Sequence, residues 1–259
     1  MKKLSQLLNK LQIAGCDIGG DPDILSVAYD SRKVLAGSLF FCIKGATVDG
    51  HDFARTAVQQ GAVAVIAERE LPDLGVPVIV TADIRRAMQI IVPYFLDYPT
   101  AHMKLIGVTG TNGKTTTTNI IYNILKNAGH RVGLIGTIET KYGDKRIGSK
   151  NTTPDIIDLQ YLLYDMYQAG TEYVVMEVSS HALALERTAG CFFDAAVLTN
   201  ITQDHLDFHQ TFDNYVQAKA LLFANLNSSG KLNTLAVINK DDPSAEYIAK
   251  VSTADTALA

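Results

Sequence analysis

The sequence predicts an α/β protein: a small N-terminal α/β domain, then a central domain whose mostly parallel sheet is covered by helices on both faces. Two observations predict this class. From Lys104 onward, short apolar runs alternate with helical stretches, and the apolar runs are hydrophobic almost without interruption. Such strands, separated by helices, are typical of parallel sheets that are buried on both sides. Hydrophobic residues make up 47% and charged residues 19% of the 259 residues, which is enough apolar material for one large or two ordinary domains.

The N-terminal domain is expected to contain short strands and two helices. Runs rich in β-branched and aromatic residues predict strands at Ser38–Ile43, Ala62–Ala67 and Val76–Val80. Helical stretches are expected at Asp52–Ala62 and Asp83–Leu96. The polar segment Asp97–His102 contains Pro99 and precedes a more regular pattern, so we place a domain boundary there. The first domain is therefore expected to span residues 1–100 and the second residues 101–259.

The second domain is expected to alternate strands with helices. The predicted strands are Lys104–Val108, Arg131–Gly136, Tyr173–Val178, Ala195–Asn200 and Thr234–Asn239. The predicted helices are Thr115–Ala128, Asp155–Ala169 and Phe212–Leu226. In such sheets ligands bind beyond the carboxyl ends of the strands, so the residues that follow each strand are candidates for a site. Four strand ends carry polar residues suited to phosphate, metal or nucleotide: TGTNGKTT, EVSSH, ITQDHLDFH and KDD.

The stretch VTGTNGKTT ends like a phosphate-binding loop but lacks one glycine. The usual pattern G-x-x-x-x-G-K-[ST] has a glycine five residues before Gly113, where this chain has Val108. Gly110 and Gly113 still permit the tight backbone that points several N–H groups at one anion. Lys114 can reach the outer phosphates, and Thr115 can place its hydroxyl on Mg²⁺ at the N-terminus of the next helix. The order of strand, glycine loop, Lys-Thr and helix favours a nucleotide site over a simple glycine turn.

Glu177 ends the apolar run YVVME. In phosphate-loop enzymes an acidic residue at the end of such a strand holds magnesium beside the loop hydroxyl, and Glu stands here for the more common Asp. The alternative is a solvated carboxylate at a strand end. The glycine loop in the same domain favours the metal role.

Three further motifs leave alternatives open. The segment Asp204–His209 packs two acids and two histidines into DHLDFH, which suits either a metal site or a polar turn before a helix. Lys219 follows Tyr215 by four residues, so the helical period puts it on an apolar face. Periodicity alone favours a buried stem with its amine in water over a functional lysine whose chemistry depends on burial. The segment NTTPD fits either a helix start, with Thr153 as N-cap and Pro154 as first helical residue, or a group of donors that face a ligand.

Net charge, hydrophobic runs and cysteine spacing argue against several classes of protein. A net charge of −4 argues against a general nucleic-acid or membrane-surface binder. No run of about 18 apolar residues is present, and polar residues interrupt the N-terminal segment, so we expect neither a membrane span nor a signal peptide. Cys16, Cys42 and Cys191 form no C-x-x-C pair, and we expect reduced thiols without a zinc site. We therefore expect a cytoplasmic protein with no nucleic-acid or membrane partner.

Taken together, TGTNGKT, NTTPD, MEVSSHAL and TNITQDHLDFH resemble the motifs of the Mur ligases, ATP-dependent amide-forming enzymes of bacterial cell-wall synthesis. The shortened phosphate loop is that family's form, which accounts for the missing glycine. With YDSRKVLAGSLFFCIKGATVDGHDF, the motifs are most similar to those of the members that add the third peptide residue. The resemblance runs from Ser26 to the end of the sequence.

The resemblance implies a role for each matching position. The residues that would surround ATP are Gly110, Thr111, Asn112, Gly113, Lys114, Thr115 and Thr116, with Asn239 near the adenine. Those that would hold the UDP-sugar peptide are Ser31, Asn151, Thr152, Thr153, Ser179 and Arg187. Thr115 and Glu177 would bind one Mg²⁺, and His205 with a carbamylated Lys219 would bind a second. Lys114, His205 and Lys219 would be the catalytic residues. A carbamate is an anion, so this implied role replaces the solvated amine for Lys219.

The implied reaction is the addition of a diamino acid, L-lysine or meso-diaminopimelate, to UDP-N-acetylmuramoyl-L-alanyl-D-glutamate through an acyl phosphate. Members of the family have three domains, and we expect the C-terminal domain and the end of the central domain to lie outside this sequence. One alternative is a module that binds the UDP-sugar peptide and ATP without completing the reaction. Another is a different phosphate-loop protein, such as a small-molecule kinase or a GTPase. The latter leaves NTTPD and DHLDFH without a role.

Overall fold

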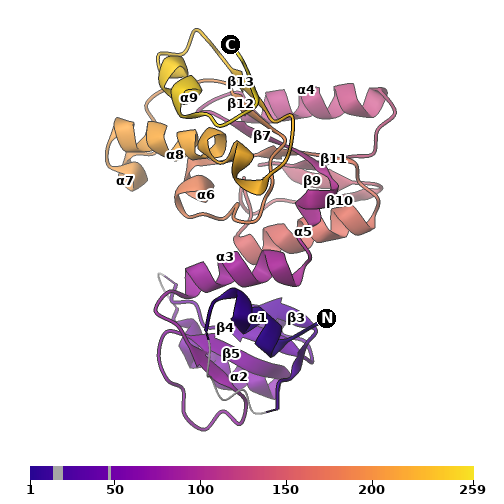
Figure 1. Ribbon diagram of the computed structural model, residues 1–259, viewed down its shortest axis with the longest axis vertical. Helices are drawn as coiled ribbons and strands as arrows, with labels where there is room; N and C mark the ends of the chain where they lie inside the picture. Colours follow the sequence, from indigo (N-terminus) through magenta and orange to yellow (C-terminus); the bar gives the residue numbers. More distant parts are fainter. Residues whose placement is uncertain (14–19, 46–47) are drawn as a thin grey trace. The chain divides into compact units, whose positions relative to one another are not determined.

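The computed structural model describes residues 1–13, 20–45 and 48–259. The chain divides into two compact units, Met1–Asp97 and Tyr98–Ala259, each of which is described by itself (Figure 1). Cys16 lies outside the described residues. Cys42 and Cys191 are free thiols, and burial raises the pKa of each to about 12. Neither thiol is therefore ionised near neutral pH.

Unit 1 is built around a parallel sheet with the strand order β3-β4-β5-β6. Its elements are β1 (Lys2–Lys3), α1 (Leu4–Lys10), β2 (Asp23–Ile24), β3 (Ser26–Ala28), η1 (Ser31–Lys33), β4 (Ser38–Phe41), η2 (Gly50–Phe53), α2 (Ala54–Gln59), β5 (Ala62–Ala67), β6 (Val78–Val80) and α3 (Ile84–Phe95). The predicted strands correspond to β4, β5 and β6, with β6 shorter at its start. The predicted helix Asp52–Ala62 ends earlier, because Gly61 has a φ of +111° and Ala62 begins β5.

Unit 2 contains one large sheet, which among the described residues has the strand order β10-β9-β8-β11-β7-β12-β13-β14. Its elements up to the middle of the unit are η3 (Pro99–His102), β7 (Lys104–Thr109), α4 (Lys114–Asn127), β8 (Val132–Ile135), β9 (Glu139–Tyr142), β10 (Lys145–Gly148), α5 (Ile156–Gln168) and β11 (Tyr173–Glu177). Those that follow are α6 (Ser180–Ala184), β12 (Ala195–Leu198), α7 (Leu206–His209), α8 (Phe212–Ala224), η4 (Leu226–Ser229), β13 (Leu235–Ile238), α9 (Ala245–Val251) and β14 (Thr256–Leu258). From β8 to β14 neighbouring strands pair in parallel, whereas β9 and β10 pair antiparallel.

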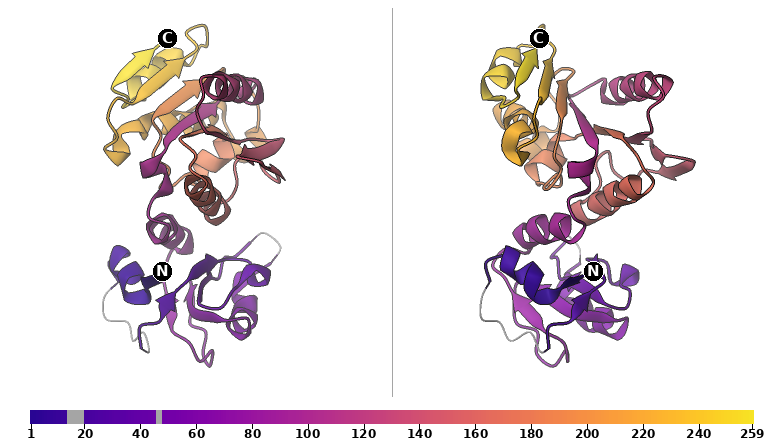
Figure 2. Two further views of the ribbon diagram at one scale, coloured as in Figure 1. Left: turned by 90° about the vertical axis from the view of Figure 1, so that its right-hand side faces the viewer. Right: turned by 45° about the vertical axis from the view of Figure 1, so that its right-hand side comes forward.

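Helices cover both faces of this sheet (Figure 2). On one face, β11 directs Val174 and Met176 into a large core that includes residues of α5, α8 and α9. On the other face, Val175 of the same strand packs with Tyr122 of α4 in a smaller core. The alternation follows the two-residue period of a strand, and it accounts for the almost unbroken apolar run YVVM.

The predicted fold class is confirmed: the sheet is mostly parallel and has helices on both faces. Each of the strands and helices predicted in the second domain is present, with ends that differ by one or two residues. The sequence reading missed the hairpin β9–β10, and the short elements α6, α7, α9 and β14. These elements are too short for the spacing of their hydrophobic residues to show a helical or strand period. In the part of the chain that the structure describes, none of the helices has the length and apolar character needed to cross a bilayer.

Candidate functional site

The glycine loop connects β7 to α4 at the carboxyl end of the sheet. Gly110 has a φ of +150°, and a β-carbon at this position would lie 1.9 Å from the hydroxyl oxygen of Thr199. Gly113 has a φ of +84° and immediately precedes α4. The first glycine is therefore required by close approach and the second by backbone conformation. Helix α4 then begins at Lys114 and presents its free N–H groups to the loop.

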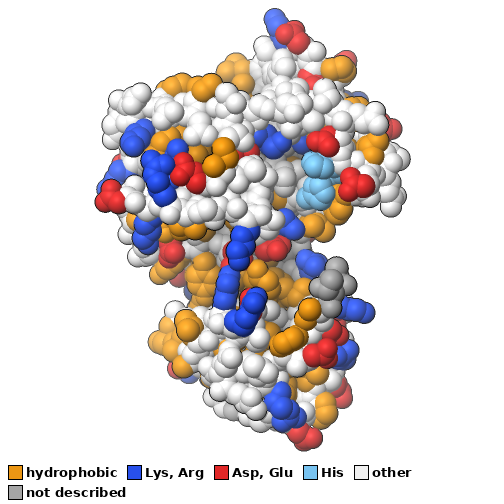
Figure 3. Space-filling model, turned by 180° about the vertical axis from the view of Figure 1, so that it is seen from behind, with side chains coloured by type: hydrophobic (Ala, Val, Ile, Leu, Met, Phe, Trp, Pro, Cys, Tyr) orange, Lys and Arg blue, Asp and Glu red, His pale blue; other side chains and the backbone are white. Residues whose placement is uncertain are grey.

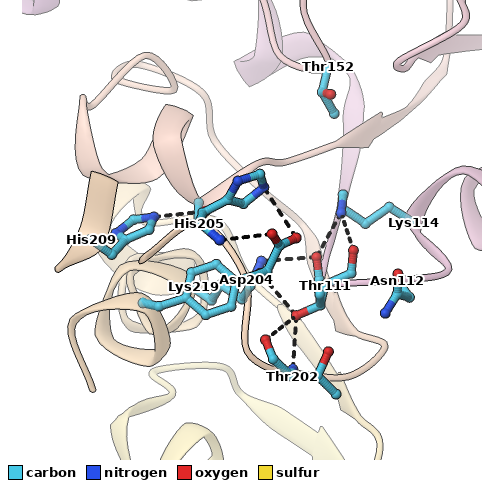
Figure 4. Close-up of polar contacts among 12 residues, drawn as sticks. Thr111, Asn112, Lys114, Thr152, Thr202, Asp204, His205, His209 and Lys219 are labelled. Atoms are coloured by element: carbon cyan, nitrogen blue, oxygen red, sulfur yellow. Dashed lines mark hydrogen bonds and ion pairs between the residues drawn. The ribbon is translucent and has the colours of Figure 1, made fainter. Parts of the chain in front are cut away.

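Two lysines converge on one carbonyl oxygen of this loop (Figure 4). The Nζ of Lys114 donates to the carbonyl oxygen of Gly110 at 2.8 Å and to that of Thr111 at 2.9 Å. The Nζ of Lys219, from α8, donates to the same Gly110 oxygen at 2.9 Å. Burial lowers the pKa of Lys114, while the charges of Glu177 and Asp204 act in the opposite direction.

Lys219 is buried together with its amine. The residue is 1% exposed, so the expectation of a solvated amine is wrong. Its Nζ lies 4.5 Å from the centre of the Tyr215 ring. Burial, followed by the charge of Lys114, lowers the pKa of Lys219 to about 7, although Asp204 partly offsets both effects. Near neutral pH a substantial fraction of the amine is therefore neutral and nucleophilic.

Glu177, at the end of β11, is a buried carboxylate. Among the described residues, only uncharged groups contact it directly. Its Oε2 accepts hydrogen bonds from the hydroxyls of Thr115 at 2.9 Å and Thr137 at 3.0 Å. Its Oε1 accepts the backbone N–H of Thr137 at 3.0 Å. A buried carboxylate without a directly paired cation is costly, and a bound divalent cation would relieve this cost. The donor set of Thr115 and Glu177 therefore fits Mg²⁺.

The segment NTTPD lies beside this carboxylate. The hydroxyl oxygens of Thr137 and Thr152 lie 3.0 Å apart, and Thr152 donates in this pair because Thr137 gives its one proton to Glu177. The buried hydroxyl of Thr153 donates to the carbonyl oxygen of Glu177 at 2.9 Å and accepts the N–H of Ser179 at 3.0 Å. Asn151 is exposed. Thr152 thus contacts the group around Glu177 through Thr137, while Thr153 links the segment to the end of β11.

The expected helix start at Thr153 and Pro154 is wrong, because α5 begins at Ile156 with Asp155 as its N-cap. The Thr153 hydroxyl cannot cap that helix, since it bonds to the backbone around Glu177 instead. Arg187 lies close by: its Nε is 3.0 Å from a carboxylate oxygen of Asp155. Ser179 is the N-cap of α6, and its hydroxyl accepts the N–H of Ala182.

The side chains of His181, His205 and His209 lie close together. Histidine side chains are exposed together at one place on the face that Figure 3 shows. The rings of His181 and His205 lie 4.8 Å apart, and the His181 and His209 rings 5.5 Å apart. The Nε2 of His205 lies 3.5 Å from a carboxylate oxygen of Asp204 (Figure 4). His205 has a φ of +51°, a strained conformation of the kind that concentrates at functional sites.

Two of these rings resist protonation. Burial, followed by a neighbouring histidine, lowers the pKa of both His181 and His209. The described residues contain no group of three or more His, Cys, Asp or Glu side chains already arranged to hold a metal. DHLDFH contributes both a turn, which leads into α7, and the pair Asp204–His205 that faces the loop.

Asn239 follows β13 and joins the same end of the sheet. Its Nδ2 donates to the carbonyl oxygen of Thr199 at 2.8 Å. Thr199 donates its hydroxyl to the carbonyl oxygen of Asn112 at 2.7 Å, so Asn239 is connected to the loop. Asn112 and Thr116 are themselves exposed. Ser31 opens the short helix η1 of unit 1, where Asp30 is the N-cap.

The structure adds residues that the sequence reading did not select: Thr137, His181, Thr199, Asn200 and Tyr215. Thr137 and Thr199 follow β8 and β12, and the rule that strand ends carry the site could have found them. Asn200 pairs with Asn112 through the bonds Asn112 N–H to Asn200 Oδ1 and Asn200 Nδ2 to the Asn112 carbonyl oxygen, each at 3.0 Å. His181 carries no signal in the sequence beyond its place after β11.

The parallel sheet, glycine loop, helix N-terminus and strand-end carboxylate define a phosphate-loop α/β protein. A sequence model of the Mur ligase middle domain matches residues 108–257, and a model of the Mur ligase family, catalytic domain, matches residues 23–96. The chain belongs to the Mur ligase family.

Two relatives with similar sequences carry the same enzyme name. A UDP-N-acetylmuramoyl-L-alanyl-D-glutamate--2,6-diaminopimelate ligase of Geobacillus thermodenitrificans is 52% identical over 95% of this chain and 50% of its own length. The enzyme of that name from Bacillus licheniformis is 49% identical over 98% of this chain and 51% of its own length. The chain therefore spans about half the length of these relatives.

Solved structures agree with the fold. A structure of UDP-N-acetylmuramoyl-L-alanyl-D-glutamate--2,6-diaminopimelate ligase has a TM-score of 0.71 and 33% identity, and the match covers 88% of this chain and 45% of that one. A MurF ligase from Thermotoga maritima, in complex with ADP, has a TM-score of 0.65 and 25% identity, and covers 87% of this chain and 48% of its own.

Proposed function

We propose that the chain carries the nucleotide-binding and UDP-sugar-binding parts of a ligase that joins 2,6-diaminopimelate to UDP-N-acetylmuramoyl-L-alanyl-D-glutamate. The observation that carries this proposal is the bond between the Thr115 hydroxyl and Glu177 beside the glycine loop, at 2.9 Å. Relatives 52% and 49% identical are named for this reaction, and their names favour diaminopimelate over L-lysine. Such a ligase would work in the cytoplasm, where ATP is available.

ATP is the proposed nucleotide, and Gly110–Thr116 is its proposed phosphate site. The free N–H groups at the start of α4 would donate to phosphate oxygens. Lys114 donates to two carbonyl oxygens of its own loop, which supports a place for its ammonium beside the proposed phosphate site. It would transfer these bonds to the outer phosphates. Asn239, tied to the loop through Thr199, is proposed to lie near the adenine.

Mg²⁺ is the proposed cofactor. Thr115 and Glu177 would hold one ion, because they supply the oxygen ligands that magnesium prefers. A bound ion would neutralise charge on the phosphates and on the acceptor carboxylate. Thr137 bonds to both Glu177 oxygens and would keep the carboxylate oriented.

A second ion is proposed at His205 and Lys219. An ammonium cannot bind a metal, but a neutral amine adds to carbon dioxide and forms a carbamate with loss of one proton. Burial and a pKa of about 7 supply the neutral amine. The carbamate would be an oxygen ligand, and His205 would add a nitrogen ligand.

The proposed reaction has two steps. A carboxylate oxygen of the D-glutamate side chain attacks the γ-phosphorus, and ADP leaves. The amine of diaminopimelate then attacks the acyl carbon, loses a proton and releases inorganic phosphate. The reacting partners are anionic, so Lys114 and the α4 N-terminus would lower the repulsion between them. Ser31, Asn151, Thr152, Thr153, Ser179 and Arg187 are proposed to hold the UDP-sugar peptide.

The test is a coupled assay and a mass measurement. The chain is incubated with Mg²⁺-ATP, UDP-N-acetylmuramoyl-L-alanyl-D-glutamate and meso-diaminopimelate, and ADP and the UDP-linked tripeptide are quantified. Tripeptide formation that requires all three substrates would support the proposal. Saturable binding of the UDP-sugar peptide without product would instead show that this chain only binds. Absence of both binding and product in a folded sample would contradict the proposal.

A separate measurement tests the carbamate. The chain is equilibrated with ¹³C-bicarbonate near neutral pH, and a carbamate carbon is sought by NMR. The signal should be absent in Lys219→Arg. A signal of the same intensity in that variant would remove Lys219 from the proposed metal site.

A further inference from the structure

Tyr215 touches the phosphate loop and the buried lysine with two different parts of one side chain. It lies on α8, is 1% exposed, and is among the largest fully buried side chains of the described chain. Its hydroxyl lies 3.0 Å from the hydroxyl of Thr111. Its ring faces the Nζ of Lys219, one helical turn later, at 4.5 Å. Lys219 in turn bonds to Gly110, the neighbour of Thr111, so Tyr215 and Lys219 contact adjacent residues of the loop as well as each other.

The hydrogen bonds of Thr111 determine the direction of the contact with Tyr215. The Thr111 hydroxyl accepts the backbone N–H of Thr202 at 2.9 Å. It donates its own proton to the Thr202 carbonyl oxygen at 3.1 Å. A hydroxyl has one proton to give, so Thr111 must accept from Tyr215. The phenol therefore donates, and it completes the hydrogen bonding of the Thr111 side chain.

The ring has a separate role at Lys219. An ammonium above an aromatic face is attracted to it, most strongly where water is excluded. The ring also limits the positions that the amine can take, while the Gly110 carbonyl oxygen holds it from the other side at 2.9 Å. Removal of the hydroxyl and removal of the ring should thus have different consequences.

We propose that Tyr215 is a positioning residue of the nucleotide site, whose hydroxyl fixes the phosphate loop and whose ring fixes Lys219. The nucleotide part rests on the proposed binding of ATP at this loop. The residue does not need to contact ATP. It sets the loop in the conformation that phosphates require and leaves the adenosine contacts unaffected.

The first test compares Tyr215→Phe with a matched control, Tyr142→Phe. Tyr142 is also buried, on β9, and its hydroxyl has a long contact of 3.4 Å with Lys145. Calorimetry measures the affinity for Mg²⁺-ATP and for adenosine. Loss of one hydrogen bond should weaken Mg²⁺-ATP binding about 5-fold and leave adenosine binding unchanged. The control should change neither. Equal losses for ATP and adenosine, or no loss for either, would overturn the proposal.

A second measurement works without any nucleotide. Hydrogen exchange is followed in the ligand-free chain over residues 109–113 and 200–203. Tyr215→Phe should speed exchange in these two segments several-fold and leave the rest of unit 2 unchanged. If the wild-type chain does not bind Mg²⁺-ATP, the proposed function fails, and the exchange result still decides whether Tyr215 holds the loop. Unchanged exchange in both segments, or faster exchange throughout unit 2, would overturn the proposal.

The ring is tested by Tyr215→Leu. In bicarbonate-free buffer, where Lys219 keeps a free amine, this variant should raise the labelling of Lys219 by an amine-reactive reagent, measured by mass spectrometry, whereas Tyr215→Phe should not. Equal labelling in the two variants would show that the ring does not fix the lysine.

Discussion

The Thr115 hydroxyl donates a hydrogen bond of 2.9 Å to Glu177, although the two residues are far apart in sequence. They meet because β11 pairs in parallel with β7, with Glu177 opposite Val108 at the end of the ladder. The first turn of α4 starts just beyond that point. A hydroxyl and a buried carboxylate are thereby placed beside the glycine loop, where a magnesium ion and phosphates would meet.

Glu177→Gln should uncouple nucleotide binding from magnesium. The amide keeps an oxygen acceptor for Thr137 but loses the charge, so Mg²⁺-ATP affinity should fall by roughly 10- to 100-fold, as expected for a lost charged interaction. ATP binding without Mg²⁺ should change little. The free energy of unfolding should not fall, because a buried charge is removed. Titration calorimetry with and without Mg²⁺ measures the first effect. The control is Glu172→Gln, at an exposed residue just before β11, and an equal loss there would contradict the assignment.

Lys114→Met should weaken Mg²⁺-ATP binding without unfolding the chain. The methionine retains an unbranched apolar stem and loses the ammonium, which costs about 1.5–3 kcal/mol for a charged hydrogen bond. Lys126→Met is the matched control, since Lys126 lies on the same helix beside the Tyr122 ring, away from the loop. Wild-type affinity in Lys114→Met would remove this residue from the phosphate site.

Gly110→Ala should destabilise unit 2 more than Gly113→Ala. The first change places a β-carbon 1.9 Å from the Thr199 hydroxyl, and overpacking of this kind costs about 1–3 kcal/mol. The second meets nothing closer than 3.8 Å, so only its left-handed conformation is penalised, by about 1 kcal/mol. Denaturant unfolding measures both. Gly148→Ala has open space and should be neutral. A reversed order of the two loop variants would contradict this loop geometry.

Lys219→Met should stabilise the chain at low pH and lose that advantage as the pH rises. The pKa of Lys219 is about 7 in the folded protein, below its ordinary value of 10.5. Below pH 7 the amine is charged in both states, and its burial destabilises the folded state fully. Between pH 7 and 10.5 the unfolded chain binds more protons, so wild-type stability rises relative to the variant. Unfolding is measured at pH 6 and pH 9 without bicarbonate, and a difference that does not shrink would contradict the lowered pKa.

Sequence reasoning predicted the geometry of the residues whose positions depend on local order along the chain. Gly110, Gly113, Lys114 and Thr115 follow one strand and open one helix, so their spacing predicts their geometry. Glu177 was found because an apolar strand ends in an acid. Helical periodicity placed Lys219 on the buried side of α8, but it could not show that the amine also lies inside, against the Gly110 carbonyl oxygen.

The parts that sequence reasoning missed depend on contacts between distant segments. The Thr153 hydroxyl was expected to cap a helix, and it bonds instead to the backbone of Glu177 and Ser179, which lie at the end of β11 and just after it. Thr137 approaches Glu177 only because β8 is the neighbour of β11 in the sheet. The local sequence of a strand does not show which other strand lies beside it in the sheet.

The most direct measurement is a calorimetric titration of the wild-type chain with ATP, performed with and without Mg²⁺ and repeated with GTP as competitor. We expect saturable binding at one site that is stronger with Mg²⁺, is weakened in Lys114→Met, and is not displaced by GTP. A folded chain that binds no ATP, or binds it equally well without Mg²⁺ and in Lys114→Met, would contradict the proposal that this loop and Glu177 form a magnesium–nucleotide site.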